Sequence, residues 1–349
     1  MKLISLAVSA AALSLASAAT AQEKLADLPE DGTRLQFPLS LANSELKREF
    51  IASPEADREV SRVLNGSVAA PGAFPFQVAL MVETEPNMAA QFCGGSMIQT
   101  DVVLTAAHCV VEERDDGYYV SDPSKIYGLV GTVNIAEGGD FVRVSKITVH
   151  PDYNPRSFDS DVALLKLERK PKVPFDVIKI PTESYADQLE QPGTESIVVG
   201  WGRTETGKSS HQLMEGRIKV LPRAACNDVF LSGRRSAAAK AFATATNILE
   251  IPGDKANQLW ADMNAAVPLP VTENMICAGT PVGPRGACDG DSGGPLMLRQ
   301  SDGTLIQAGV VSWGLAAQEQ PGCERNAKFS MYTRMGNYTD WVLTELGYK

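Results

Sequence analysis

Three short strings carry side chains that together could perform covalent catalysis. They are TAAHC, which contains His108, DSDVALL, which contains Asp161, and GDSGGP, which contains Ser292. Each string alone has an ordinary explanation: a structural histidine, a turn aspartate before an apolar strand, and a loop serine. The last string is the most specific, because glycines on both sides let backbone N–H groups turn inward and leave the serine exposed.

Taken together, the three side chains fit one mechanism. A serine hydroxyl is a poor nucleophile until a base takes its proton, and a histidine base needs a carboxylate that fixes its tautomer and stabilises the imidazolium. We therefore predict that His108 is the base, Asp161 the orienting carboxylate and Ser292 the nucleophile. The backbone N–H groups of Gly290 and Ser292 would form an oxyanion hole, in which each donor contributes roughly 3–4 kcal/mol.

The elements that must position these residues are predicted to be short β-strands. Apolar or β-branched runs alternate with clusters of Gly, Pro, Asn and Asp, which is typical of antiparallel sandwiches and barrels. Two Ala-rich stretches, 236–249 and 255–266, are predicted as helices inserted in this framework. Apolar side chains from Tyr338 to Leu346 recur at helical spacing, which indicates a C-terminal helix. The strand runs are 77–82, 102–104, 141–144, 162–167, 197–199, 217–221, 296–298 and 308–313.

The composition excludes several classes of protein. The chain has 349 residues, of which 44% are hydrophobic and 21% charged, and these values are ordinary for globular proteins. They exclude a disordered chain, a collagen-like chain and a coiled coil. A formal net charge of -10 argues against a nucleic-acid-binding protein, which needs a basic face to neutralise phosphates.

The first 21 residues predict a secretion signal. Lys2 precedes an uncharged run of small and apolar residues, and Ala19-Thr20-Ala21 has the small-x-small form of a signal-peptidase site. A retained membrane anchor is the alternative, and it is disfavoured because the segment is rich in Ala and Ser and only weakly apolar. No later stretch approaches the roughly 18 apolar residues that span a bilayer. We expect a secreted protein, in the medium or a periplasm-like space, without membrane attachment after signal removal.

Residues 22–62 differ in composition from the rest of the chain. They hold nine acidic and six basic residues, with no Cys or Trp and no sustained period of 2 or 3.6. Such a polar segment between a signal and a folded body predicts a propeptide, with a small accessory domain as the alternative. The folded domain is then 63–349, with an insertion at about 232–270.

The six cysteines are an even set in a chain bound for an oxidising compartment. Many pairings are possible, so spacing alone does not decide the connectivity. A zinc site is the alternative, but the chain has no Cys-x-x-Cys pair and only three histidines. We expect three disulfides, no metal and no cofactor. The cysteines are Cys93, Cys109, Cys226, Cys277, Cys288 and Cys323.

Further strings accompany the three that carry chemistry. They are FCGGS at 92–96, GWG at 200–202, ICAG at 276–279, VSWG at 311–314 and YTR at 332–334. With these strings, and with the chain order His, Asp, Ser, residues 63–349 resemble the trypsin/chymotrypsin-type serine proteases. The resemblance implies an all-β fold of two antiparallel six-stranded β-barrels, with the three residues in the cleft between them. To this we add a C-terminal helix and a partly helical insertion.

The same resemblance implies an activation switch and a set of disulfides. The string RVLNG at 62–66 is similar to the family's activation junction. Cleavage after Arg62 would free the ammonium group of Val63 to pair with Asp291, and this buried ion pair would order the oxyanion turn and the substrate pocket. The implied bridges are Cys93–Cys109, Cys226–Cys277 and Cys288–Cys323.

The predicted substrate pocket lacks the acidic residue that would select a basic side chain. Gly286 stands at the position of the pocket base, Ala287 follows it, and Gly314 and Ser330 match the wall positions. Burying an unpaired Lys or Arg there would cost on the order of several kcal/mol. We therefore expect a neutral pocket that prefers medium or large apolar side chains. Because such a protein would not cut after Arg62, a second protease would activate it in trans.

These observations predict a secreted serine endopeptidase, made as a zymogen, that acts on protein or peptide substrates through an acyl-enzyme. Ser312, Trp313 and Gly314 would pair as an edge strand with the extended substrate backbone. This strand favours peptides over the small acyl substrates of an esterase. The alternative from another class is a catalytically silent homologue that binds partners through the cleft, although such proteins usually lack one of the three catalytic residues.

Overall fold

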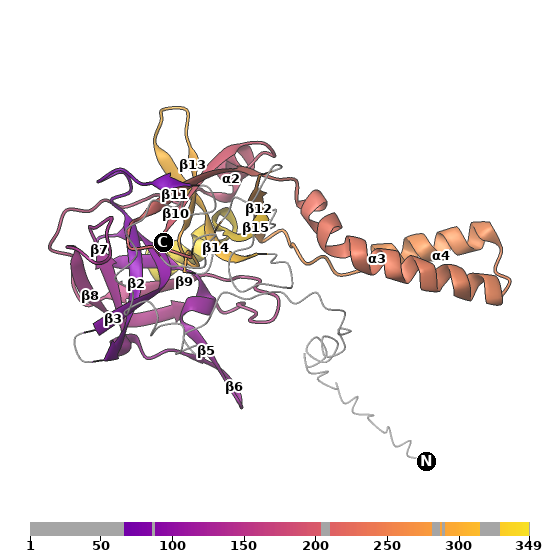
Figure 1. Cartoon of the computed structure of the whole chain (residues 1–349), viewed down its shortest axis with the longest axis horizontal. Coiled ribbons are helices and arrows are strands. Elements are labelled where there is room, and N and C mark those ends of the chain that lie inside the picture. The colour runs from indigo at the N-terminus through magenta and orange to yellow at the C-terminus, as the bar shows by residue number, and fades with distance from the viewer. Residues whose placement is uncertain are drawn as a thin grey trace, which may run out of the picture. The chain divides into compact units, whose positions relative to one another are not determined.

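A computed structural model describes residues 66–85, 88–203, 210–280, 287, 290–314 and 329–348. Six antiparallel strands of the N-terminal half close into a first barrel, in the order β2-β3-β4-β9-β8-β7 (Figure 1). Its strands are β2 (Gln77–Glu85), β3 (Met88–Gln99), β4 (Val102–Thr105), β7 (Ile126–Val130), β8 (Asp140–Val149) and β9 (Ala163–Leu167).

A second antiparallel barrel follows in the C-terminal half. Six strands run in the order β11-β10-β13-β14-β15-β12, and a pairing between β11 and β12 closes the ring. The short strand β1 (Ser67–Val68) adds to β11 from outside. The ring strands are β10 (Glu195–Gly200), β11 (Met214–Val220), β12 (Met275–Gly279), β13 (Pro295–Arg299), β14 (Leu305–Gly314) and β15 (Phe329–Arg334). The prediction of two six-stranded antiparallel barrels is confirmed.

The predicted strand runs lie within or overlap strands of the structure, because alternating apolar residues face the two barrel cores. The cores are lined by residues such as Leu104 and Leu165 in the first barrel and Leu296 and Tyr332 in the second. Four barrel strands, β3, β7, β12 and β15, were not predicted as strands. In β3 and β12, small residues give no β-branched pattern. In β3 the reason is close packing: a Cβ at Gly95 would lie 2.6 Å from Val103 Cγ1.

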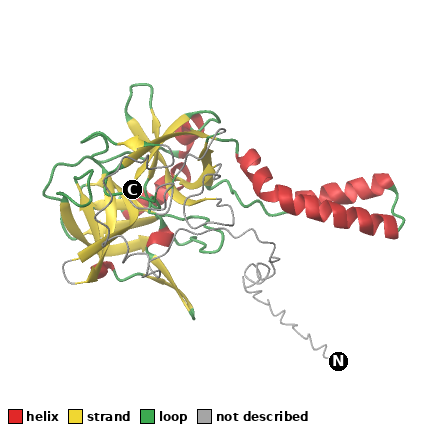
Figure 2. Ribbon diagram, viewed as in Figure 1, coloured by secondary structure: helices red, strands yellow, loops and turns green. Residues whose placement is uncertain are grey.

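A separate hairpin and several short helices accompany the barrels. Figure 2 shows the strands in yellow and the helices in red. Strands β5 (Val111–Arg114) and β6 (Gly117–Val120) form a separate hairpin. The predicted C-terminal helix is α5 (Thr339–Glu345), which packs Val342 on the first core. None of the described helices has the length and apolar character needed to cross a bilayer. The remaining short helices are η1 (Ala107–Cys109), η2 (Pro123–Lys125), η3 (Met335–Tyr338) and α2 (Glu183–Leu189).

The two Ala-rich stretches form helices, but the first helix is longer than predicted. Helix α3 (Arg223–Ile248) begins directly after Pro222, so it includes a polar first half that the Ala-rich pattern did not reveal. It pairs with α4 (Gly253–Ala265) (Figure 1). The rings of Phe242 and Trp260 meet between the two helices, with their centroids 5.3 Å apart. Near the start of α3, the Cys226–Cys277 disulfide fastens the helix to β12.

A bidentate ion pair at the start of β8 fastens the segment that follows β9. Both oxygens of Asp140 accept from the Arg169 guanidinium, at 2.6 and 2.8 Å, and Oδ2 also accepts from the Lys172 N–H at 2.7 Å. The hydrogen bonds from Arg169, against the opposing effect of burial and with help from Lys172, lower the pKa of Asp140 to about 2. When folding lowers the pKa of a carboxylate, that carboxylate stabilises the fold at pH values above its pKa in the unfolded state. The contribution is lost as the pH falls and the folded-state carboxylate is protonated.

We therefore expect Asp140→Asn to lower the free energy of unfolding by about 2 kcal/mol at pH 7. The difference from wild type should shrink as pH falls from about 4 through about 2, the range between the unfolded and folded pKa values. Urea unfolding at several pH values measures it, with Asp176→Asn on an exposed side chain as the control. A difference that does not change with pH would contradict the assignment.

Candidate active site

Strand pairing in the first barrel brings the predicted base and the predicted carboxylate together. Strands β4 and β9 are antiparallel neighbours, with Thr105 opposite Ala163. The chain therefore leaves β4 and enters β9 at the same end of the barrel. His108 lies three residues after Thr105 in helix η1, and Asp161 lies two residues before the start of β9, so residues distant in sequence meet at this end.

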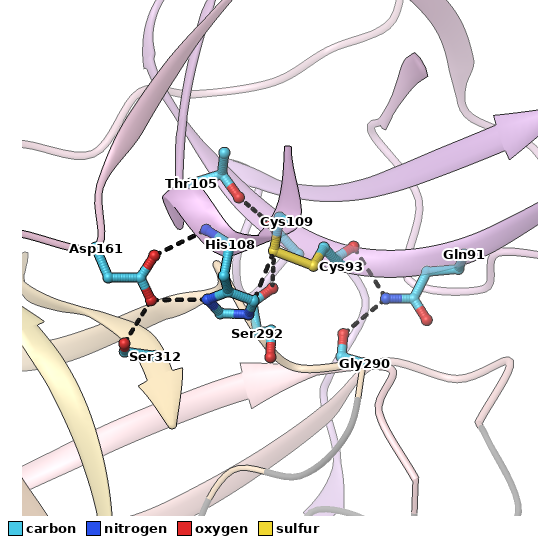
Figure 3. Close-up of a disulfide and its surroundings, with 10 residues drawn as sticks. Gln91, Cys93, Thr105, His108, Cys109, Asp161, Gly290, Ser292 and Ser312 are labelled. Carbon is cyan, nitrogen blue, oxygen red and sulfur yellow. Dashed lines mark hydrogen bonds and ion pairs between the residues drawn. A yellow bond between two sulfur atoms is a disulfide. The ribbon is translucent and has the colours of Figure 1, made fainter. Parts of the chain in front are cut away.

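The contact between the two side chains is short and buried (Figure 3). His108 Nδ1 lies 2.7 Å from Asp161 Oδ2, and the backbone N–H of His108 donates to Oδ1 at 2.9 Å. Asp161 is fully buried, and His108 is 7% exposed. A buried carboxylate is stable only when its oxygens accept hydrogen bonds, so Asp161 holds the imidazole in one orientation with Nε2 left for another partner.

The second barrel also binds Asp161, which the sequence did not reveal. The Ser312 hydroxyl on β14 donates to Oδ2 at 2.5 Å, and the Thr333 hydroxyl on β15 donates to the backbone carbonyl of Asp161 at 2.7 Å. Ser312 was predicted only as part of a substrate-binding strand. Its hydroxyl donates to the same carboxylate oxygen that His108 Nδ1 contacts.

Ser292 lies in a turn whose glycines cannot be replaced without strain. Gly290 and Gly293 have φ values of +92° and +81°, in the region that favours glycine. The Gly294 N–H donates to the Asp291 carbonyl at 2.9 Å and closes the turn. The Gly94 N–H of β3 donates to the Ser292 carbonyl at 2.7 Å, which holds the turn against the first barrel.

Ser292 and His108 approach each other around the Cys93–Cys109 disulfide (Figure 3). Cys109 Sγ lies 3.8 Å from His108 Nε2 and 3.6 Å from the Ser292 carbonyl oxygen. Ser292 and His108 are both among the described residues, and no hydrogen bond joins Ser292 Oγ to His108 Nε2. Such catalytic contacts are often long without substrate and tighten when it binds.

The backbone around Ser292 leaves two donors available. Within the described part of the chain, no acceptor takes the N–H of Gly290 or of Ser292. Between them, Asp291 is buried, and its Oδ1 accepts from the Gly202 N–H at 2.8 Å. Asp291 also excludes a side chain at Gly200, since a Cβ there would overlap Oδ1.

The described substrate-binding positions lie on neighbouring strands of the second barrel. Gly314 on β14 faces Ser330 on β15 in the strand register, and Ala287 packs on the core of this barrel. From Val311 onward, β14 no longer pairs with β13, which leaves one edge of Trp313 and Gly314 unpaired by any described strand. The other predicted site residues, Arg62, Val63, Gly286, Cys288 and Cys323, lie outside the described residues.

Two aromatic residues near the site were missed by the sequence analysis. The ring centroids of Phe158 and His108 lie 5.7 Å apart, with the rings edge to face. The ring centroids of Phe230 on α3 and Trp313 lie 5.3 Å apart. Phe158 stands three residues before Asp161, where its sequence position was a usable signal. Phe230 is brought in by the insertion, and nothing in its local sequence indicated this contact.

One group of described residues has atoms close enough to hold a metal ion: Cys93, His108 and Cys109. The two sulfur atoms are joined to each other in the disulfide, so they offer no thiolate to a metal. The predicted bridges Cys93–Cys109 and Cys226–Cys277 are confirmed.

Comparison with known proteins identifies the family. Residues 63–342 match the family described as Trypsin. The chain belongs to the trypsin family. A suppressor of tumorigenicity 14 protein homolog from Bos taurus is 30% identical to it over 292 residues, and vitamin K-dependent protein C from Mus musculus is 30% identical over 309 residues. These alignments cover 82% and 87% of the trypsin-family chain but only 28% and 56% of the relatives, so the chain spans little more than a quarter of the first relative's length and little more than half of the second's.

We expect Gly293→Ala to destabilise the protein by about 3–5 kcal/mol, because the added Cβ would combine a left-handed backbone with a clash. It would overlap Thr105 Oγ1 and lie 2.5 Å from the Gly94 carbonyl oxygen. Gly303 has a similar φ of +87° but open space around its Cβ position, so Gly303→Ala should cost only about 1–2 kcal/mol. Urea unfolding of the two variants separates the clash from the backbone effect, and equal losses would show that the turn is not packed as described.

Proposed function

We propose that this chain is a serine endopeptidase that hydrolyses peptide bonds through an acyl-enzyme on Ser292. The observation that carries the proposal is the buried 2.7 Å contact between Asp161 Oδ2 and His108 Nδ1, because it leaves His108 Nε2 directed toward the Ser292 turn. A carboxylate bound to one imidazole nitrogen makes the other nitrogen a base. Membership of the trypsin family supports the same chemistry.

In the proposed reaction, His108 Nε2 takes the proton of Ser292 Oγ as the oxygen attacks the carbonyl carbon of the substrate. The resulting oxyanion accepts hydrogen bonds from the N–H groups of Gly290 and Ser292, whose donors are not used by described acceptors. The imidazolium, stabilised by Asp161, then gives its proton to the leaving amine. A water molecule, deprotonated by the same imidazole, hydrolyses the acyl-enzyme.

The proposed substrate is an extended peptide chain that lies along the free edge of β14. Trp313 and Gly314 offer backbone groups there that no described strand pairs. An extended peptide adds to such an edge by main-chain hydrogen bonds, while pockets select its side chains. Gly286, Ala287, Gly314 and Ser330 carry no charge, so we propose a neutral pocket for apolar residues.

We further propose that the protein is exported and activated by proteolysis. In this scheme residues 1–21 are the signal and 22–62 the propeptide, and a second protease cuts after Arg62. The freed ammonium of Val63 then pairs with Asp291. The buried position of Asp291 beside Ser292 supports this, because a charge there acts directly on the oxyanion turn.

The second candidate function is that of a silent homologue that binds partners without cleaving them. It would hold if the oxyanion turn did not become competent after cleavage, even though all three residues are present.

We expect hydrolysis only after cleavage at Arg62, because the Val63 ammonium does not exist before it. Replacing residues 58–62 with an enteropeptidase recognition sequence allows controlled release of the same Val63. Cleaved protein should hydrolyse a fluorogenic peptide, whereas cleaved Ser292→Ala should lose at least about 10³-fold in kcat/KM. Cleaved protein with native stability but no Ser292-dependent turnover would favour the silent homologue.

For specificity, a peptide panel that varies the residue before the scissile bond should favour medium or large apolar residues over Lys and Arg. The reason is the desolvation cost of a cation in a pocket without a carboxylate. We expect a preference of at least about 10²-fold in kcat/KM, since an unpaired buried charge costs several kcal/mol. Ser330→Asp is the matched variant and should raise turnover after Lys and Arg. A wild-type preference for Arg or Lys would overturn the pocket assignment while keeping the mechanism.

A further inference from the structure

A glutamine side chain of the first barrel reaches the oxyanion turn of the second. Gln91 lies on β3, where Cys93 pairs with Leu80 and Gln91 pairs with Met81 of β2. Phe92 is therefore an extra residue, and the strand bulges at this point. A bulge changes the direction of neighbouring side chains, and it is here that the Gln91 amide leaves the barrel wall and meets Gly290 (Figure 3).

The Gln91 amide uses both of its N–H donors on backbone carbonyl groups. Nε2 donates to the Gly290 carbonyl at 2.7 Å and to the Cys93 carbonyl at 2.9 Å. Two carbonyl acceptors require a group with two donors at one atom, which an amide provides and a carboxylate or a thioether of the same length does not. Gln91 Nε2 thus connects the carbonyl of Gly290, two residues before Ser292, to the carbonyl of Cys93, which forms the disulfide next to His108.

The Gly290 carbonyl belongs to a peptide unit that controls the proposed oxyanion hole. This unit joins Gly290 to Asp291, so it lies between the two peptide units that carry the N–H groups of Gly290 and Ser292. Gly290 has a φ of +92°, and glycine is the residue with the most freedom to leave such a conformation. No side chain can limit it, since a Cβ at Gly290 would lie 3.0 Å from Gly202 Cα.

We propose that Gln91 is a positioning residue that holds the Gly290–Asp291 peptide so that the Gly290 N–H points at the developing oxyanion. The inference rests on the proposed function and adds to it a residue that acts through Gly290 without touching the substrate. Without the amide donors, the Gly290 carbonyl has no described partner, and the peptide can rotate away. Gln91 then acts on the transition state more than on substrate binding.

The experiment uses protein cleaved after Arg62 and compares Gln91→Met, Gln91→Glu and the control Gln99→Met. Met keeps the length of the side chain without a donor, and Glu presents acceptor oxygens to two carbonyl oxygens. Gln99 lies on the same strand and donates to the Tyr348 hydroxyl, far from Ser292 in the strand order. The readouts are kcat and KM for an apolar peptide, the inhibition constant of the matching peptide aldehyde, and the thermal unfolding midpoint.

We expect Gln91→Met to lower kcat about 10- to 100-fold with KM within about twofold, and to weaken the aldehyde by a similar factor, because its adduct with Ser292 places an oxyanion in the hole. Gln91→Glu should lose more than Gln91→Met, since a carboxylate repels both carbonyl groups. Gln99→Met should match wild type. A residue that only fills space would change the unfolding midpoint. A loss in kcat that grows from Gln91→Met to Gln91→Glu at an unchanged unfolding midpoint would therefore support the positioning role.

Two results would overturn the inference in distinguishable ways. If wild type is active and Gln91→Met keeps kcat and aldehyde affinity within twofold, the positioning role is wrong and the proposed function stands. If cleaved wild type shows no Ser292-dependent turnover, the proposed function fails and the inference fails with it. Where Gln91→Met lowers the unfolding midpoint, the inhibition constant of the aldehyde still decides, because an inactive unfolded fraction lowers the apparent kcat but leaves KM and the inhibition constant of the folded enzyme unchanged.

Discussion

The buried carboxylate of Asp161 is the constraint around which the site is organised. Both of its oxygens accept hydrogen bonds, from the backbone and imidazole of His108 in the first barrel and from Ser312 in the second. Its backbone carbonyl accepts from Thr333. A buried charge costs several kcal/mol unless its oxygens are satisfied, so the two barrels must meet in the one arrangement that supplies these donors. The arrangement that satisfies Asp161 also sets the direction of His108 Nε2.

The Ser292 turn is held by contacts from the first barrel rather than by its own residues alone. Its glycines give it freedom that a rigid oxyanion site cannot tolerate, and the hydrogen bonds to Gly94 and Gln91 remove that freedom. Both bonds come from β3, whose small residues allow the close approach. A Cβ at Gly94 would lie 3.2 Å from Gly294, so the same glycines that weaken the strand pattern permit the contact between barrels.

The insertion joins the barrel framework at its base. Its helices α3 and α4 pack on each other through Phe242 and Trp260, and near its start α3 is fastened to β12 by a disulfide. Phe230, close to that disulfide, packs on Trp313 of the proposed substrate-binding strand. The base of the insertion therefore packs against the end of β14, while most side chains farther along α3 are exposed.

The sequence by itself indicated the three residues proposed for catalysis, because strings such as GDSGGP impose backbone and side-chain demands that few other structures meet. The two-barrel fold and the two observed disulfides were predicted through the resemblance of these strings to the trypsin/chymotrypsin-type proteases, since spacing alone left the cysteine pairing open. Strand runs with β-branched residues were also predictable. The glycine-rich strand β3, the early start of α3 and the roles of Gln91, Phe230 and the Ser312 hydroxyl were not. Each depends on contacts between residues far apart in the chain, and hydrogen-bond partners of that kind leave no local pattern. The packing of one barrel against the other decided the roles of Gln91 and the Ser312 hydroxyl, since burial is what makes an unpaired carboxylate or carbonyl costly, and the packing of the insertion on the second barrel decided that of Phe230.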